Sequence, residues 1–247
     1  MKTHPLLIAA SLLACSLHAQ PGHQGGALFG GSMTKLFGDN SAFSAEMEMQ
    51  VAVPPDQTMT MPEKIAFDSG KVRIETDLAK AEGAQMPAGT IEHMKAMGMD
   101  KTITISCPET KTAYLIYPGL SAYAEAPITD PNATRPASAF KIETTALGKE
   151  TVDGHPCVKN KIVITDDQGN AHTYTVWNAT GLKNFPVKIE TSDQGHTMTM
   201  IFKKIKTTKP DASAFEPPAD YKKYDSPQAL MQQEMMKRMG NLPPGHP

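Results

Sequence analysis

Residues 42–53 have the sequence AFSAEMEMQVAV, in which apolar and polar side chains alternate. The odd-numbered positions are apolar: Phe43, Ala45, Met47, Met49, Val51 and Val53. The even-numbered positions carry Ser44, Glu46, Glu48 and Gln50. A period of two is typical of a β-strand with one face in the core and the other in solvent. The stretch therefore predicts a half-buried strand in a sheet with one apolar face.

The same strand signals dominate residues 41–207. Further predicted strands carry Met59–Phe67, Val72–Glu75, Ile103–Cys107, Ala113–Tyr117, Phe140–Val152, Val158–Thr165, His172–Trp177, Val187–Thr191 and His196–Phe202. Short connections rich in Gly, Asp and Asn supply the positive φ angles that hairpin turns need. Because strands that follow each other in sequence usually pair, we expect one meandering antiparallel sheet.

Segments outside the strands complete the expected organisation. Two helices are predicted, over Ile91–Met97 after Thr90 and from Ser226–Pro227 to Met239. The expected division is a signal peptide over 1–19, a flexible Gly-rich lead-in over 20–40, a sheet domain over 41–225, and a Met-rich amphipathic helix with a disordered tail over 226–247.

The N-terminus predicts export. Lys2 precedes an apolar run over residues 6–14, and small and polar residues follow as far as Gln20. This order is that of a secretory signal peptide, and the run is shorter than the roughly 18 residues that a spanning helix needs. We expect cleavage after Ala19 and a periplasmic or secreted protein without a transmembrane segment in the mature chain. The alternative is a lipid-anchored envelope lipoprotein, because residues 12–15 are similar to a lipobox in which Cys15 is lipidated.

The net charge excludes some classes of binding partner, and the cysteine content predicts a disulfide. Loss of residues 1–19 removes Lys2 and leaves 23 basic against 26 acidic side chains, a formal net charge of −3. This charge predicts neither a nucleic-acid partner nor an anionic membrane surface. Cys107 and Cys157 remain as an even pair in an exported chain, which predicts one disulfide; the alternative is two separate buried thiols.

Three segments together resemble a known family. They are Ala42–Met47, Glu109–Pro118 and Asp211–Tyr221, and they occur in the order of the opening strand, a central hairpin and the closing segment of the LolA/LolB-like lipoprotein-carrier superfamily, especially its branches of unknown function. The resemblance implies a mainly β (α+β) fold: a strongly curved antiparallel sheet, an incomplete β-barrel, covered by a few helices. It also implies binding of acyl chains or lipidated proteins. The inner-face arginine of such carriers has no counterpart, because the parity of Arg73 places it outward.

Methionines are the candidate ligand-lining residues. Three Met-x-Met pairs lie on three predicted strands, and the set is Met47, Met49, Met59, Met61, Met198, Met200 and Phe202. Methionine is flexible and polarizable, so a face lined with it can adapt to varied apolar ligands. One alternative is ordinary core packing. Another is Cu(I) binding by thioethers, with His196 near Met198 and with His93 beside Met94.

Catalytic signatures are missing from the sequence. It contains no Gly-x-Ser-x-Gly, no His-Glu-x-x-His and no phosphate-binding glycine loop. We therefore expect a non-enzymatic protein without catalytic residues, cofactor or dedicated metal site. Three hypotheses remain open: a binding protein with an apolar groove, a structural or interaction protein that contacts an envelope partner through its C-terminal helix, and a Cu(I)-binding protein.

Overall fold

The computed structural model describes residues 30–53, 57–83, 89–193 and 196–240. The predicted signal peptide, the lipidation candidate Cys15, the first part of the lead-in and the tail over 241–247 lie outside the described residues. No helix within the described part of the chain is long and apolar enough to cross a bilayer.

Within the described residues, twelve strands form one sheet. They are β1 Ala42–Val53, β2 Gln57–Asp68, β3 Lys71–Asp77, β4 Lys101–Cys107, β5 Thr112–Tyr117, β6 Ala122–Pro127, β7 Lys141–Val152, β8 His155–Thr165, β9 Ala171–Ala179, β10 Phe185–Asp193, β11 His196–Lys206 and β12 Lys222–Tyr224. The helices are α2 Gly31–Thr34, α3 Thr90–Ala96, α4 Pro131–Thr134 and α5 Pro227–Gly240, with 3-10 turns η1 Lys35–Phe37, η2 Leu78–Lys80, η3 Pro118–Leu120, η4 Ala137–Ala139, η5 Thr180–Leu182 and η6 Ala212–Phe215.

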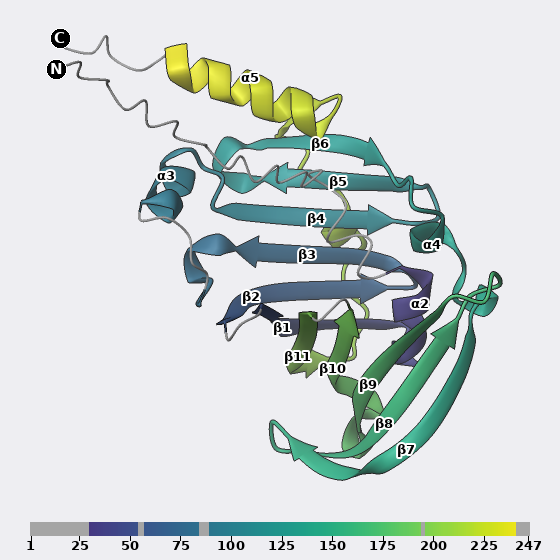
Figure 1. Ribbon diagram of the computed structural model, residues 1–247. Helices are drawn as coiled ribbons and strands as arrows, with labels where there is room; N and C mark the ends of the chain where they lie inside the picture. The colour runs from purple at the N-terminus through teal and green to yellow at the C-terminus, as the bar shows by residue number, and fades with distance from the viewer. Residues whose placement is uncertain (1–29, 54–56, 84–88, 194–195, 241–247) are drawn as a thin grey trace, which may run out of the picture.

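The sheet joins two meanders. Strands β1 to β6 follow one another on one side, β7 to β11 do so on the other, and the antiparallel pair β1–β11 connects them (Figure 1). The final strand, β12, pairs in parallel with β6 at the far edge. The meandering antiparallel topology predicted from the alternation is confirmed, and the sheet does not close into a barrel.

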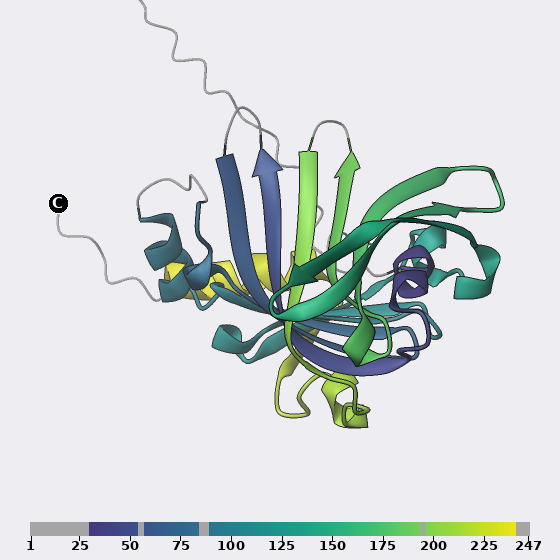
Figure 2. The ribbon, with the colours of Figure 1, turned by 90° about the horizontal axis from the view of Figure 1, so that it is seen from below.

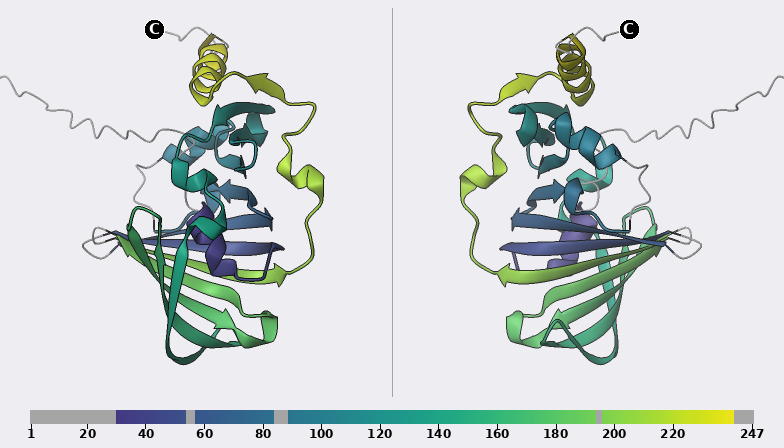
Figure 3. Two further views of the ribbon diagram at one scale, coloured as in Figure 1. Left: turned by 90° about the vertical axis from the view of Figure 1, so that its right-hand side faces the viewer. Right: turned by 90° about the vertical axis from the view of Figure 1, so that its left-hand side faces the viewer.

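Curvature gives the sheet a hollow side and an outer side. Figure 3 shows α2 and α4 on the hollow side, while the chain that carries η6 crosses the other side. Register shifts in three strand pairs, between Ser44 and Glu46, Pro186 and Lys188, and Ala146 and Gly148, mark bulges. A bulge adds a residue to one strand and increases the local twist, which bends the sheet.

The apolar parity of β1 faces the hollow side and forms the main core. Phe43, Phe67, Phe185 and Phe202 are all at most 3% exposed, and Phe37 of η1 contacts each of their rings at 4.7 to 5.9 Å between centroids. Aromatic pairs at such distances add stability beyond the area they bury. Residues from α2 and η1 therefore plug the hollow face of the sheet.

This plug differs from the flexible lead-in that the glycines of residues 20–40 suggested. Met33, Leu36 and Phe37 are buried in the main core. A side chain at Gly31 is excluded, because a Cβ there would lie 2.1 Å from the carbonyl oxygen of Arg135. One of those glycines thus permits close packing between α2 and the segment after α4.

Where strands β4 to β6 lie, the sheet has an apolar cluster on each of its faces. On the outer face, Ile105, Cys107 and Ile116 form a second cluster with Phe215 of η6. On the hollow face, Tyr117, Ala122 and Ala124 form a third cluster with Tyr224 of β12 and Leu230 of α5. The C-terminal segment therefore crosses the outer face of the sheet and ends on the other.

The predicted disulfide between Cys107 and Cys157 is wrong. Both thiols are free and buried. Cys107 belongs to the outer cluster on β4, whereas Cys157 belongs to the main core on β8. Strands β3, β2, β1, β11, β10 and β9 separate them in the sheet, whereas a disulfide requires Cα atoms within about 7 Å. The alternative of two separate buried thiols is what the structure contains.

Both predicted helices form, with small shifts at their ends. Helix α3 begins at Thr90, after Gly89, and ends before Gly98, whose φ of 67° is the left-handed conformation that suits a helix terminus. Helix α5 begins at Pro227, and Ser226 Oγ accepts a hydrogen bond from Ala229 N at 3.1 Å. This contact is the N-terminal cap that serine commonly supplies.

Candidate functional site

Three cross-strand rows on the hollow face contain all seven methionine-set residues. The β1–β2 and β1–β11 registers place Met59, Val51 and Met198 in an outer row. They place Met61, Met49 and Met200 in a middle row. The inner row holds Glu63, Met47 and Phe202. Partners directly opposite each other on antiparallel strands share a face, so these nine side chains form one continuous surface.

Burial decreases from the inner row to the outer row. Met47, Met49, Met200 and Phe202 are 2%, 6%, 0% and 0% exposed and belong to the closed core. Met59, Met61 and Met198 are half-buried, as is Val51. The structure thus brings the seven predicted residues together on one face, and it leaves three of them partly open to solvent.

The half-buried residues lie on two long hairpins. Strands β1 and β2 and strands β10 and β11 project side by side beyond the rest of the sheet (Figure 2). We call Val51, Met59, Met61 and Met198 the open methionine patch. Three of the four pack against the main core at its edge, so the patch is the solvent-facing continuation of that core.

Glu63 is the polar exception on this face. It is 7% exposed, and its Oε1 accepts a hydrogen bond from Thr76 Oγ1 at 2.9 Å. Among the described residues, its Oε2 is the buried side-chain oxygen or nitrogen that has no hydrogen-bond partner. Burial raises the pKa of this carboxyl to about 7, because a low-dielectric environment disfavours the charged form.

Sequence reasoning missed Glu63, although a signal was present. Its neighbours of the same parity on β2 are Met59, Met61, Ile65 and Phe67. Glu63 therefore occupies a position that the alternation predicts to be buried. A carboxylate is rarely buried without a partner, so a Glu at such a position is a signal of a functional role.

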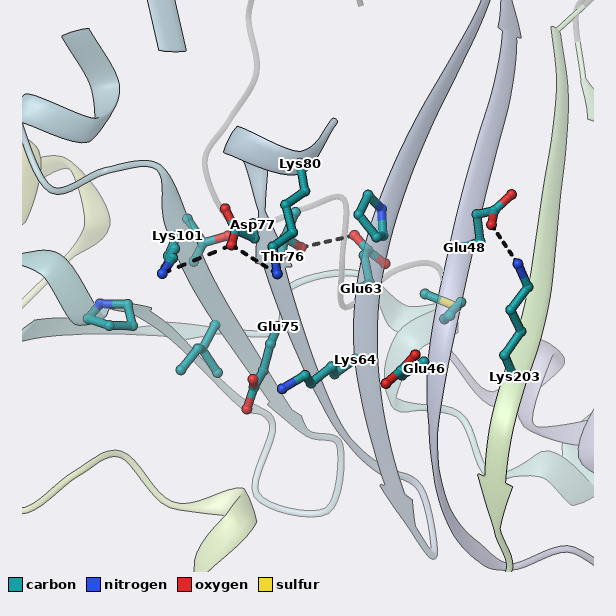
Figure 4. Close-up of a pocket in the computed structure, with 15 residues that line it drawn as sticks. Glu46, Glu48, Glu63, Lys64, Glu75, Thr76, Asp77, Lys80, Lys101 and Lys203 are labelled. Atoms are coloured by element: carbon teal, nitrogen blue, oxygen red, sulfur yellow. Dashed lines mark hydrogen bonds and ion pairs between the residues drawn. The ribbon is translucent and has the colours of Figure 1, made fainter. Parts of the chain in front are cut away.

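A charged cavity of about 480 Å³ lies against strands β1 to β4 (Figure 4). Glu63 and Thr76 are among its lining residues, together with the charged residues Glu46, Glu48, Lys64, Glu75, Asp77, Lys80, Lys101 and Lys203. Several are paired: Lys203 Nζ lies 2.9 Å from Glu48 Oε2, and Asp77 Oδ2 lies 3.7 Å from Lys80 Nζ. Hydrogen bonds from Lys203 and Gln50 lower the pKa of Glu48. These are solvated pairs of opposite sign, which do not suit an apolar ligand.

The two histidines considered for Cu(I) lie on different elements. His196 begins β11 and His93 is in α3, and both side chains are exposed. Within the described residues, no group of three or more His, Cys, Asp or Glu side chains is placed to hold a metal ion.

Only some of the apolar side chains of the C-terminal helix α5 pack against the rest of the protein. Leu230 is fully buried, and Glu234 is hydrogen-bonded to Tyr224 Oη and Lys237 Nζ. Met235 and Met236 are 42% and 57% exposed. The side chain of Met239, the predicted end of the helix, lies outside those described.

Comparison with known proteins finds one family model and several solved structures. A family model described as a domain of unknown function, DUF4412, matches residues 165–221. No curated protein matches the chain. Among solved structures, LolA superfamily protein NE2245 from Nitrosomonas europaea is 8% identical, with a TM-score of 0.43 and coverage of 77% of this chain and 96% of its own.

Two mycobacterial proteins are similar to a comparable extent. Lipoprotein LppX from Mycobacterium tuberculosis is 12% identical, with a TM-score of 0.39 and coverage of 72% of this chain and 94% of its own. LprF from Mycobacterium bovis is 14% identical, with a TM-score of 0.39 and coverage of 75% and 95%. At these identities and TM-scores, none of the three structures bears on the superfamily or the ligand of this chain.

Proposed function

We propose that this chain is a non-enzymatic protein of the cell envelope, periplasmic or secreted, that holds an apolar ligand against the open methionine patch. An acyl chain, free or carried by a lipidated protein, is the ligand class that fits such a surface. The observation that carries the proposal is the gradient of burial along β1, β2 and β11, where one apolar face runs continuously from a closed core to half-buried methionines. Exposed contiguous apolar surface is a feature of ligand and interaction sites.

Methionine suits this role for a physical reason. Its unbranched thioether side chain changes rotamer easily and can pack against apolar groups of different shape. Val51 is the exception in the patch, and it lies between Met59 and Met198 in the outer row. A stiff residue flanked by two flexible ones gives a surface that adapts at its sides.

The test is binding of an uncharged, apolar fluorescent dye to purified protein, with two variants of adjacent residues on β2. Met59→Glu places a charge on the patch, whereas Thr58→Glu places the same charge at an exposed position of opposite parity. We expect Met59→Glu to weaken dye binding at least about tenfold, or about 1.4 kcal/mol, and Thr58→Glu to leave it unchanged. Far-UV circular dichroism checks that both variants fold. Equal binding by the two variants would contradict the proposal.

A second candidate is an interaction protein with a closed core. It is favoured by the complete burial of Met200 and Phe202 and by the exposed Met235 and Met236 on α5, which would contact an envelope partner. Absence of dye binding by the wild-type protein would favour this candidate. A Cu(I) titration tests the third hypothesis, that of a Cu(I)-binding protein in which His196 and Met198 act as ligands.

A further inference from the structure

Glu63 lies at the boundary between the closed core and the open methionine patch. In its row, Met47 is opposite on β1 and Thr76 is opposite on β3. Met61 and Met59 follow on the same face of β2, two and four residues away. At about 3.4 Å per residue, the patch extends roughly 14 Å from Glu63 along the strand.

The surroundings of Glu63 supply no counter-charge along the two neighbouring strands. Lys64 and its partners Glu46 and Glu75 are one position further along their strands, so they point to the outer face. Lys80 and Lys101 are engaged with Asp77. The raised pKa of Glu63 accordingly has burial as its main cause and no nearby charge among its causes.

One carboxyl oxygen of Glu63 is left without a partner at this position. Thr76 satisfies Oε1, but Oε2 is buried and unpaired. A buried polar atom without a hydrogen bond costs about 1 to 3 kcal/mol, and such atoms are rare in folded proteins. The cost is removed if a bound molecule supplies the missing partner.

We propose that Oε2 of Glu63 is the hydrogen-bonding end of the ligand site and that it selects a ligand with an uncharged acceptor oxygen, such as an ester or amide carbonyl, beside its apolar chain. This inference rests on the proposed function. The protonated carboxyl donates from Oε2 to that oxygen while Oε1 keeps its bond from Thr76. The chain of the ligand then lies on Met61 and Met59. A ligand that ends in a carboxylate is disfavoured once Glu63 ionises, because two like charges would meet in a buried site.

The test compares two uncharged probes of equal chain length, a long-chain methyl ester and the corresponding hydrocarbon, by displacement of the apolar dye at pH 6. Glu63→Met keeps an apolar side chain of similar length and removes the donor. Glu63→Gln keeps a donor in its amide nitrogen. Lys64→Met is the matched control, because Lys64 is adjacent but faces outward.

We expect the wild-type protein, Glu63→Gln and Lys64→Met to bind the ester about 2- to 13-fold more tightly than the hydrocarbon, the range given by one hydrogen bond of 0.5 to 1.5 kcal/mol. In Glu63→Met this ratio should fall to about one. An equal ratio in the wild-type protein and Glu63→Met would overturn the role of Glu63 while dye and probe binding still support the proposed function.

Two further outcomes are informative. If the wild-type protein prefers a long-chain amine to the ester, and both Glu63 variants lose that preference, Glu63 acts as a buried anion and the proposed acceptor ligand is wrong. If the wild-type protein binds neither dye nor probes, the proposed function fails, and the role of Glu63 fails with it.

Discussion

At the scale of single residues, Glu63 shows how position decides the behaviour of a side chain. Glu46 and Glu48 alternate with core residues on β1, face outward and pair with Lys204 and Lys203. Each has its pKa lowered, with the hydrogen bond from its lysine as the largest cause. Glu63 is on the opposite face, and burial without a cation raises its pKa to about 7. The same side chain is therefore a solvated anion on one face and a neutral acid on the other.

The raised pKa of Glu63 predicts a loss of stability with rising pH. Between its ordinary pKa of 4.5 and about 7, the unfolded chain has released this proton and the folded chain still holds it. The unfolded state then binds fewer protons, so the free energy of unfolding falls as pH rises through this window. The total decrease is about 3 kcal/mol. Above and below the window, the contribution of Glu63 does not change with pH. Glu63→Gln removes the ionisation.

Urea denaturation at pH 4.5 and pH 8 measures this effect. We expect the stability of Glu63→Gln relative to the wild-type protein to increase by about 3 kcal/mol between the two pH values. The control is Glu143→Gln on β7, which makes the same change at an exposed position. A difference for Glu63→Gln that stays constant between the two pH values would show that Glu63 is not buried as a neutral acid.

At the scale of elements, the short plug made by α2 and η1 is more important than its length suggests. Seven residues over 31–37 form too short a helix to be stable alone. They are ordered because Met33, Leu36 and Phe37 fill the hollow side of the sheet. The plug covers the inner part of the apolar face and leaves the open methionine patch at the far ends of the hairpins.

Removal of the largest plug side chain should destabilise the whole protein. Phe37 is 1% exposed and contacts four other phenylalanine rings. We expect Phe37→Ala to reduce the free energy of unfolding by about 3 to 5 kcal/mol, the usual cost of a large-to-small change in a core. Asp39→Ala, at an exposed position two residues on, should change it by less than about 0.5 kcal/mol. A loss below 1 kcal/mol for Phe37→Ala would mean that the plug is not packed in solution.

At the scale of the whole molecule, the pair β1–β11 makes one unit from two meanders. Met49 faces Met61 on β2 and Met200 on β11, so the rows of the main core cross the junction. The main core includes Ile65 and Ile74 from the first meander and Ile164 and Ile189 from the second. Neither meander can bury its apolar face without the other.

This shared core predicts one cooperative unfolding transition. The chain has a single tryptophan, Trp177, on β9 of the second meander. Its fluorescence reports that half, whereas far-UV circular dichroism reports the strands of both. We expect the two signals to give the same denaturant midpoint, as for a two-state domain. A fluorescence midpoint clearly separated from the circular dichroism midpoint would show that the halves unfold independently.

Alternation along residues 42–53 was enough to predict β1 and its buried face, and the resemblance to a known superfamily implied the fold class. Hairpin turns are local, so the pairs β7–β8 and β10–β11 could also be predicted, because neighbours in sequence meet at small entropic cost. Each Met-x-Met pair was placed on one face of its own strand for the same reason: parity within a strand is a local property.

Pairing between distant segments was decided only by the tertiary structure. The register of Met49 with Met200 joins residues 151 positions apart, and no turn sets that register. The same limit explains the wrong disulfide. An exported chain with two cysteines favoured a bond between Cys107 and Cys157, but the sheet order places six strands between them. The burial of Met49 and the partial exposure of Met59 could not be predicted from the strand alone, because both lie on the same apolar face. The same holds for Oε2 of Glu63, which is buried without a hydrogen-bond partner. Burial is a property of the assembled chain, because it is set by atoms that come from every part of the sequence.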